Sequence, residues 1–366
     1  MKTKITKKSV SIVNNKIVKP YYRIYECLKD NIISCREKVI QDVYTKEQTE
    51  SWQFSSRFMP EVVQKEIHTK VRKGYSLSKM TEQGIVFTVE WLTQESTNLD
   101  NSLLDKLIRA LSSMIVISNF SGCDLKNKQV MLRMFDTDIK KFFPTKGQTI
   151  TPEHVNSAYT IPCRYASSNK LEIVIFRNEE WQKVLFHELI HTYSLDIGLD
   201  TELIRKSLSN IFGGLVCDFN LTEAYCEFWA RTIWTLVVGR LKIENQIKLL
   251  NQQKVWSIKQ ALRVVEIMQL SEFSKCKEKT AAFSYYVITA YLLNAYPSMI
   301  EWCEHECNEL IEFPNNFQGK QSFLRLLNNI VRSPAVNSAW QRVLKSVKSD
   351  ITKGNDRRVT SRMSLL

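Results

Sequence analysis

The sequence lacks the features that would mark a membrane or secreted protein. In its 366 residues, no apolar stretch approaches the roughly 18 residues that a membrane-spanning helix needs. The lysine-rich N-terminus is not followed by the apolar region of a secretory signal, and internal repeats and low-complexity tracts are absent. We therefore expect an intracellular, cytoplasmic protein without a membrane span, long enough to hold two or three subdomains.

A disulfide or structural metal pattern is also missing. The nine cysteines are an odd number, scattered without a recognisable spacing, as in proteins of a reducing compartment. One segment, Cys303-Glu304-His305-Glu306-Cys307, does bring metal-ligating residues close together. On a helix, however, Cys303 and Cys307 share a face while His305 points away, which disfavours a second metal site.

Positive charge is concentrated at the two ends of the chain. Of the formal net charge of +13, residues 1–20 contribute +6 and residues 342–366 contribute +5. The basic character therefore describes the ends and not a cationic cleft. We expect flexible basic tails at residues 1–20 and 348–366 that can touch nucleic acid or an acidic partner, with plain solubilising ends as the alternative.

Histidine is rare in this chain, yet two of its five histidines stand four residues apart in His187-Glu188-Leu189-Ile190-His191. On a helix, positions i and i+4 lie one turn apart on the same face, so both imidazoles can reach one metal ion. Glu188 lies about 100° round the helix, where it can touch a water on that metal. This HExxH pattern predicts a zinc site with His187 and His191 as ligands. Two unrelated histidines on a helix are the alternative.

The residues before the motif favour a site. Residues 171–177 are rich in apolar and β-branched residues, which predicts a strand. Asn178, Glu179 and Glu180 then offer an N-cap and two carboxylates for the first turn of a helix. Apolar residues continue at helical spacing into the motif, and Gly198 is the expected stop.

A catalytic zinc ion normally has three protein ligands and one open position. The metzincin pattern requires a third histidine six residues after the second and a glycine three residues after it, where this chain has Ile197 and Ser194. That class is therefore excluded. The next candidates are Glu223 and Glu227, which a helix capped by Thr222 would place one turn apart.

These two segments together resemble the gluzincins, the thermolysin-like zinc metallopeptidases. The resemblance implies that Glu223 is the third metal ligand and that Glu227 orients His187. A carboxylate in the latter position fixes the imidazole tautomer and raises the basicity of the ligand. An exposed acidic stripe on an amphipathic helix is the alternative for both glutamates.

Four segments are also similar to uncharacterised metallopeptidase-like proteins of large DNA viruses. They are residues 155–160, 175–191, 222–227 and 283–286. The resemblance implies a viral protein, located in the host cytoplasm or the virion, and it implies no particular substrate.

The chemistry expected of such a site is hydrolysis of a peptide bond. Glu188 would be the general base that takes a proton from the attacking water and returns it to the leaving amine. Gluzincins bind the oxyanion with a residue from the C-terminal half, for which Tyr285 and Tyr286 are the candidates, with simple packing as the alternative. The substrate would lie extended along an edge strand. The residues expected to bind it are Asn156, Ser157 and Ala158.

The predicted elements are typical of an α+β protein. Strands are expected at 84–92, 130–135 and 171–177, and helices at 59–72, 101–117, 201–215, 222–241, 243–270 and 280–295. We expect a zincin-like fold, with a mixed-sheet N-terminal lobe, a mainly helical C-terminal lobe and the active-site cleft between them. The expected divisions are 21–98, of unclear type, 99–198, the α/β lobe ending in the HExxH helix, and 199–347, the helical lobe.

Three functions remain open at this point. The first is a zinc-dependent metallopeptidase that binds one Zn²⁺ ion and hydrolyses protein or peptide substrates. The second is a catalytically silent zincin-fold protein, structural or virion-associated, that still binds zinc. The third is a nucleic-acid-associated protein that works through its tails. The presence of Glu188 favours the hydrolase, because a degenerate enzyme often loses its base before its ligands.

Overall fold

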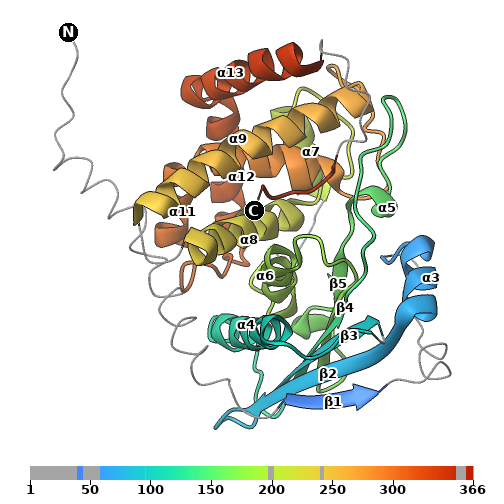
Figure 1. The fold of residues 1–366 in the computed structure, drawn as a ribbon. Coiled ribbons are helices and arrows are strands. Elements are labelled where there is room, and N and C mark those ends of the chain that lie inside the picture. Colours follow the sequence, from blue (N-terminus) through green and yellow to red (C-terminus); the bar gives the residue numbers. More distant parts are fainter. Residues whose placement is uncertain are drawn as a thin grey trace.

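The computed structural model describes residues 39–43, 58–94, 96–196, 202–239, 243–351 and 360–365. The predicted N-terminal tail, residues 1–20, and the helix stop expected at Gly198 lie outside these ranges. A lobe built on a β-sheet and a lobe built of helices meet along the middle of the molecule (Figure 1). The fold is α+β, as the sequence predicts.

One mixed sheet of six strands carries the first lobe. Its order is β1-β2-β3-β4-β6-β5, in which β3, β4 and β6 run parallel while the outer pairs are antiparallel. The short strand β5 is therefore the edge of the sheet on the side of β6. The strands are β1 (Val39–Val43), β2 (Val71–Met80), β3 (Val86–Gln94), β4 (Gln129–Phe135), β5 (Ala158–Thr160) and β6 (Lys170–Ile175).

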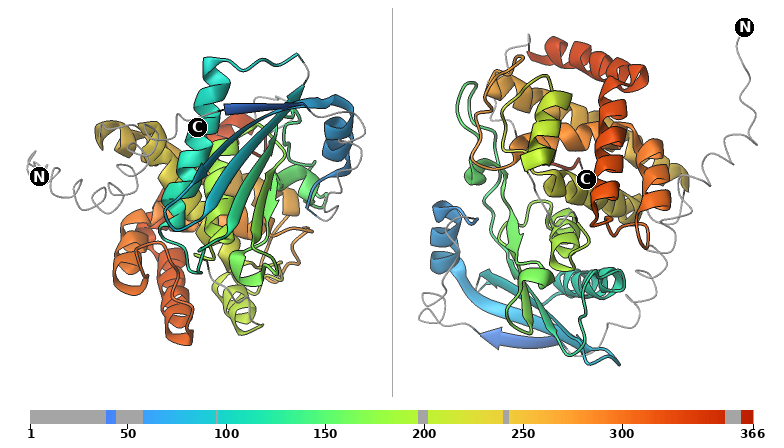
Figure 2. Two further views of the ribbon diagram at one scale, coloured as in Figure 1. Left: turned by 90° about the horizontal axis from the view of Figure 1, so that it is seen from below. Right: turned by 180° about the vertical axis from the view of Figure 1, so that it is seen from behind.

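Helices cover both faces of this sheet. Figure 2 shows α4 (Asn101–Ser118) and α6 (Trp181–Thr192) against one face and α3 (Glu61–Lys70) against the other. The period-2 alternation of β3 explains this, since Trp91 belongs to the large core under α4 and α6, whereas the next residue, Leu92, belongs to the small core under α3. α6 is buried almost all round, because the second lobe packs on its other side.

The second lobe is helical. Its long members are α8 (Leu221–Gly239) and α9 (Ile243–Met268), and α8 lies directly on α6. The remaining helices of this lobe are α7 (Glu202–Ile211), η2 (Phe283–Ile288), α10 (Thr289–Asn294), α11 (Tyr296–Glu306), α12 (Phe317–Arg332) and α13 (Pro334–Ile351). Two short helices, α5 (Pro152–Val155) and η1 (Cys163–Tyr165), lie between β4 and β6 in the chain. No helix in the described ranges is long and apolar enough to cross a membrane.

The structure differs from the sequence prediction near the N-terminus. The helix expected at 59–72 ends at Lys70, and the chain continues directly as strand β2, which was not predicted. Strands β1, β2 and β3 join the same sheet as β4 and β6. The described strands of residues 21–98 and those of residues 99–198 thus belong to one sheet, which continues across the predicted division at residue 98.

The predicted C-terminal tail also differs. Residues 360–365 are packed between the two lobes, with Ser361 and Ser364 fully buried. The side chain of Gln260 donates to the carbonyl oxygens of Thr360 and Arg362, and that of Gln253 donates to Ser364 Oγ. These buried amides would lose their partners if the segment left, so residues 360–365 are a fixed part of the fold and not a free basic tail.

Candidate metal centre

α6 carries the HExxH motif into the interface between the lobes. It begins at Trp181, and the preceding Glu180 occupies the N-cap position in the left-handed conformation, with φ of 61°. The Glu180 carboxylate is buried, lies 3.0 Å from Lys141 Nζ and accepts the backbone N–H groups of Met363 and Ser364. The first-turn role predicted for Glu179 and Glu180 is therefore wrong, because tertiary partners hold Glu180 outside the helix.

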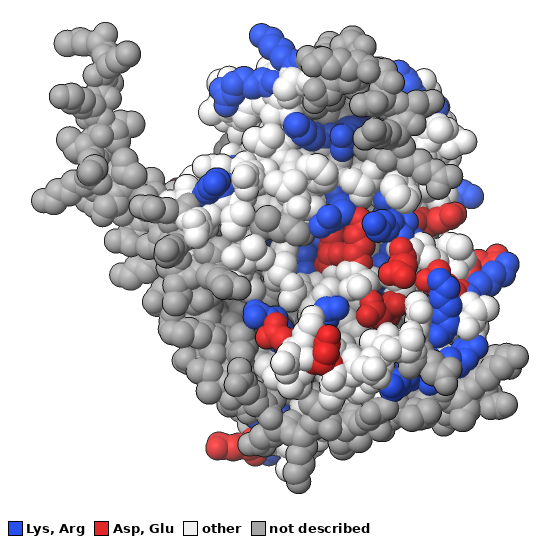
Figure 3. Space-filling view, in the orientation of Figure 1, with Lys and Arg blue, Asp and Glu red and all other residues white. Residues whose placement is uncertain are grey.

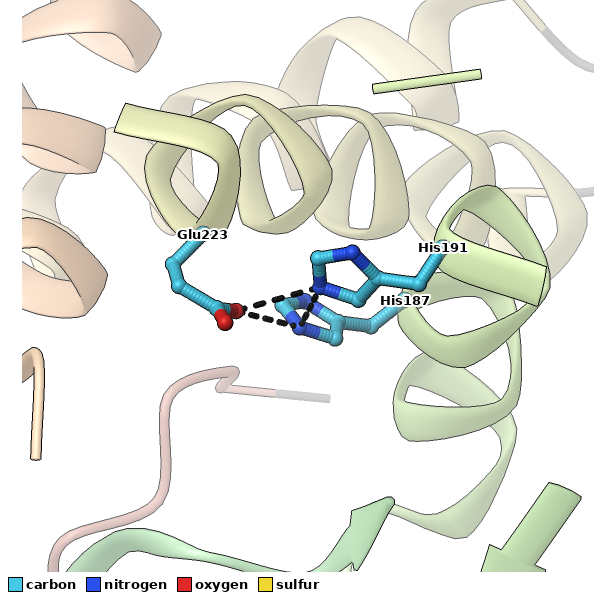
Figure 4. A group of neighbouring side chains, drawn as sticks. All are labelled: His187, His191 and Glu223. Atoms are coloured by element: carbon cyan, nitrogen blue, oxygen red, sulfur yellow. Dashed lines mark hydrogen bonds and ion pairs between the residues drawn. The ribbon is translucent and has the colours of Figure 1, made fainter. Parts of the chain in front are cut away.

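α8 places the predicted third ligand opposite the two histidines. Its first turn is capped by Asn220, whose side chain accepts the N–H of Thr222, and not by Thr222 as predicted. Figure 4 shows Glu223 on α8 pointing toward His187 and His191 on α6. Glu223 Oε2 lies 3.1 Å from Nε2 of each histidine, and the two Nε2 atoms lie 3.2 Å apart. The structure thus brings together all three predicted ligands.

This triangle of atoms fits a divalent cation. An ion with the bond lengths of about 2.0–2.2 Å that zinc forms with imidazole nitrogen and carboxylate oxygen can lie equidistant from three atoms at these separations. Two nitrogens and one oxygen are also the donor set of many catalytic zinc sites, which leave a fourth position open. Burial alone would raise the pKa of the Glu223 carboxyl, but the imidazoles of His191 and His187 lower it, so this ligand is anionic.

Glu227 lies beside His187, on the side of the ring away from Glu223. Its Oε2 lies 3.2 Å from His187 Nδ1, the nitrogen that faces away from Glu223. The same carboxylate is 3.0 Å from Lys183 Nζ and 2.7 Å from Arg231 Nε, and all three side chains are buried. Lys183 and Arg231 hold the pKa of Glu227 well below its usual range despite burial. Neither cation was predicted from the sequence, although Lys183 stands one turn before His187 and Arg231 one turn after Glu227.

His191 has its own partner, Asp196, which was not predicted from the sequence. Asp196 Oδ2 lies 2.9 Å from His191 Nδ1, and Cys226 Sγ lies 3.6 Å from the same nitrogen. Asp196 follows the end of α6, where Ser194 turns the chain back with φ of 54°. The only signal for this contact in the sequence is an acidic residue shortly after the HExxH helix.

Glu188 lines the cavity beside the two histidines and is 7% exposed. Burial raises the pKa of its carboxyl, which is the direction expected of a group that exchanges a proton near neutral pH. The geometry thus brings the predicted base to the predicted ligands.

The two candidate tyrosines, Tyr285 and Tyr286, differ in their position relative to the cavity. Both lie in η2, a π-helical segment. Tyr285 lines the cavity, with its ring centroid 5.8 Å from that of His187, and burial together with the nearby Glu223 carboxylate raises its pKa well above 10. Tyr286 instead donates its hydroxyl to the carbonyl oxygen of Ser361 at 2.6 Å, outside the cavity lining. Only Tyr285 is brought to the site.

A cavity of about 360 Å³ opens in front of these side chains. The predicted substrate-binding residues Asn156, Ser157 and Ala158 all line it, and β5 begins at the last of them. Met363 of the C-terminal segment lines it as well, with its sulfur 3.7 Å from Lys183 Nζ. In Figure 3 acidic side chains, with basic ones next to them, gather over the junction of the two lobes.

Four cysteines form two pairs, contrary to the unpatterned distribution inferred from the sequence. Cys217 and Cys276 form a disulfide that joins the segment before α8 to the segment before η2. Beside it, Glu278 accepts the backbone N–H groups of Asp218 and Phe283, and burial raises its pKa to about 7. A second disulfide joins Cys123 to Cys163. The first pair ties together the two segments that lead to Glu223 and Tyr285.

Comparison with known proteins yields no match, whether to a family model, a curated protein or a solved structure.

Proposed function

We propose that this protein is a zinc metallopeptidase of the gluzincin type with a zincin-like fold. The observation that carries the proposal is the convergence of His187, His191 and Glu223 at 3.1–3.2 Å, with Glu188 on the same helix as the two histidines. The placement of Glu227 behind His187 supports it, since metal-bound histidines usually give their second nitrogen to such a partner. A relationship to metallopeptidase-like proteins of large DNA viruses is part of the same proposal.

Each residue of the site has a separate role in the proposed reaction. A zinc ion bound by the three ligands would supply a Lewis acid that lowers the pKa of a bound water toward about 7. The Glu188 carboxylate takes the proton of the attacking water and later delivers it to the leaving amine. The Tyr285 hydroxyl donates to the oxyanion that forms at the substrate carbonyl. Its raised pKa keeps this hydroxyl protonated and therefore able to donate.

The edge strand gives the substrate a place to bind. β5 pairs with β6 on one side, and its residues line the cavity on the other. An extended peptide that adds to this edge receives main-chain hydrogen bonds, while its side chains alternate between the cavity and solvent. Asn156, Ser157 and Ala158 lie where such a peptide would pass the ligands. The substrate class is therefore a protein or peptide in extended conformation.

The wild-type protein provides the direct test. We expect one zinc ion per chain by elemental analysis, hydrolysis of an unstructured protein such as casein, loss of that hydrolysis on chelation and its recovery when zinc is restored. One bound zinc ion without turnover of any protein or peptide library would instead favour the silent, structural zincin-fold protein. Absence of bound zinc would exclude both.

Tyr285→Phe is expected to lower kcat by about 10²-fold, because removal of one oxyanion donor typically costs 10²–10³-fold. KM should change little, since the phenol ring stays and the donor acts on the transition state. Steady-state kinetics on a fluorogenic peptide measure both constants. Tyr291→Phe is the matched control, because Tyr291 lies on α10 and is not part of the cavity lining. Equal kcat values for the two variants would remove Tyr285 from the mechanism.

A further inference from the structure

The far side of His191 is enclosed by a loop that both lobes hold in place. The loop, residues 193–196, begins at the end of α6, and the N–H of Leu195 donates to the carbonyl oxygen of Ile190 at 3.0 Å. From the helical lobe, the N–H of Phe313 donates to the Leu195 carbonyl at 2.9 Å. From the sheet lobe, the N–H of Gly122 donates to the Tyr193 carbonyl at 2.9 Å. Residues 193–196 therefore have a fixed position relative to α6.

Arg164 completes this arrangement. Its guanidinium donates to the carbonyl oxygen of Ser194 at 2.7 Å and to that of Asp196 at 3.4 Å, and it lies 3.6 Å from Asp196 Oδ1. The other carboxylate oxygen, Oδ2, is the one 2.9 Å from His191 Nδ1. The Asp196 carboxylate is thus held between a permanent cation and the imidazole. Arg164 itself follows Cys163, whose disulfide to Cys123 anchors η1 to the segment after α4.

We propose that Asp196 is a positioning residue that fixes the orientation and tautomer of His191, and that Arg164 holds Asp196 in place for this purpose. The proposal rests on the metal centre proposed above. With Nδ1–H donated to Asp196, the lone pair of His191 Nε2 is directed at the triangle formed with His187 and Glu223. Each imidazole then has a carboxylate beside its Nδ1, Glu227 for His187 and Asp196 for His191, and a buried or half-buried cation lies next to each carboxylate.

The second neighbour of His191 Nδ1, Cys226, is a weaker candidate for the same task. Its sulfur lies 3.6 Å from His191 Nδ1, whereas Asp196 Oδ2 lies 2.9 Å from the same nitrogen. A neutral sulfur is a poor hydrogen-bond acceptor compared with a carboxylate. Cys226 therefore serves as the internal comparison for Asp196.

The experiment measures zinc affinity by competition with a chromophoric chelator, together with the visible spectrum of the cobalt(II)-substituted protein. Asp196→Ala is expected to raise the zinc Kd by about 10–100-fold and to change the cobalt spectrum. Asp196→Asn, which keeps one acceptor oxygen, should lie between Asp196→Ala and the wild type. Arg164→Gln should weaken binding less than Asp196→Ala, and its effect should disappear in the Asp196→Ala background because the two residues act in series.

Two variants serve as controls. Cys226→Ala removes the other neighbour of the same nitrogen, and Asp105→Asn breaks an exposed pair with Arg109 on α4. Both should keep the wild-type zinc Kd within about twofold. Far-ultraviolet circular dichroism of the metal-free proteins verifies that each variant folds. A wild type that binds one zinc ion, with Asp196→Ala and Asp196→Asn unchanged in Kd and cobalt spectrum, would overturn the role of Asp196 and leave the proposed function standing. Absence of zinc from the wild type would overturn both.

Discussion

Glu188→Gln is expected to retain one zinc ion per chain and to lose peptide hydrolysis by about 10²–10⁴-fold in kcat, the usual contribution of a positioned general base. The amide has nearly the volume of the carboxylate but cannot accept a proton from water. Because Glu188 is not one of the three converging ligands, removal of its charge leaves the donor set intact. Metal analysis and steady-state kinetics on the same preparation separate the two effects.

A surface substitution of the same kind gives the control. Glu61→Gln breaks an exposed pair with Lys65 on α3 and should leave both zinc content and kcat unchanged. If Glu188→Gln kept wild-type kcat, Glu188 could not be the base, and hydrolysis by a contaminating protease would have to be tested. If it lost zinc as well as activity, the variant would not distinguish a base from a ligand, and the ligand set would need revision.

Glu227→Gln is expected to lower the free energy of unfolding by about 3–5 kcal/mol, the typical cost of removing one partner of a buried ion pair. Its carboxylate is the shared counter-ion of Lys183 and Arg231, and the exposed fractions of the three side chains are between 0% and 2%. Without that charge both cations remain in the interior uncompensated. Urea unfolding of the metal-free proteins measures the effect, so that changes in metal binding do not contribute.

The matched control for Glu227→Gln is Glu266→Gln. Glu266 pairs with Lys146 at 3.7 Å, and both side chains are about half exposed, so this change should cost less than about 1 kcal/mol. Equal stabilities of the two variants would mean that Lys183 and Arg231 find other partners or water when Glu227 is neutral. The zinc Kd of Glu227→Gln should also rise, because His187 loses the carboxylate behind Nδ1.

The parts of the site that follow helical periodicity could be predicted from the sequence. His187 and His191 are one turn apart, and so are Glu223 and Glu227, so each pair shares a helix face once its helix forms. Asp196 could not be placed in this way, because it follows a left-handed residue, Ser194, after which no period applies. Its contact with His191 depends on how the loop folds back.

The choice between Tyr285 and Tyr286 could not be made from the sequence either. A helix of period 3.6 gives no reason to prefer Tyr285 over its neighbour Tyr286. In η2 the π-helical hydrogen bonds widen the turn, which changes the face that each side chain occupies.

The buried ion pairs of Lys141 with Glu180 and of Lys183 with Glu227 could not be predicted from the sequence either, because each joins residues about 40 positions apart. Strand β2 was missed because Arg72, Lys73 and Gly74 interrupt its apolar residues.

The anchoring of residues 360–365 has a consequence for biosynthesis. Glu180 receives the backbone N–H of Ser364, a residue 184 positions later in the chain, and Met363 forms part of the cavity wall. At about 5–20 residues per second, a ribosome needs on the order of 10–40 seconds to pass from one to the other. The nascent polypeptide therefore contains His187 and His191 well before Met363 is synthesised, and the cavity beside them is complete only after translation of this late segment.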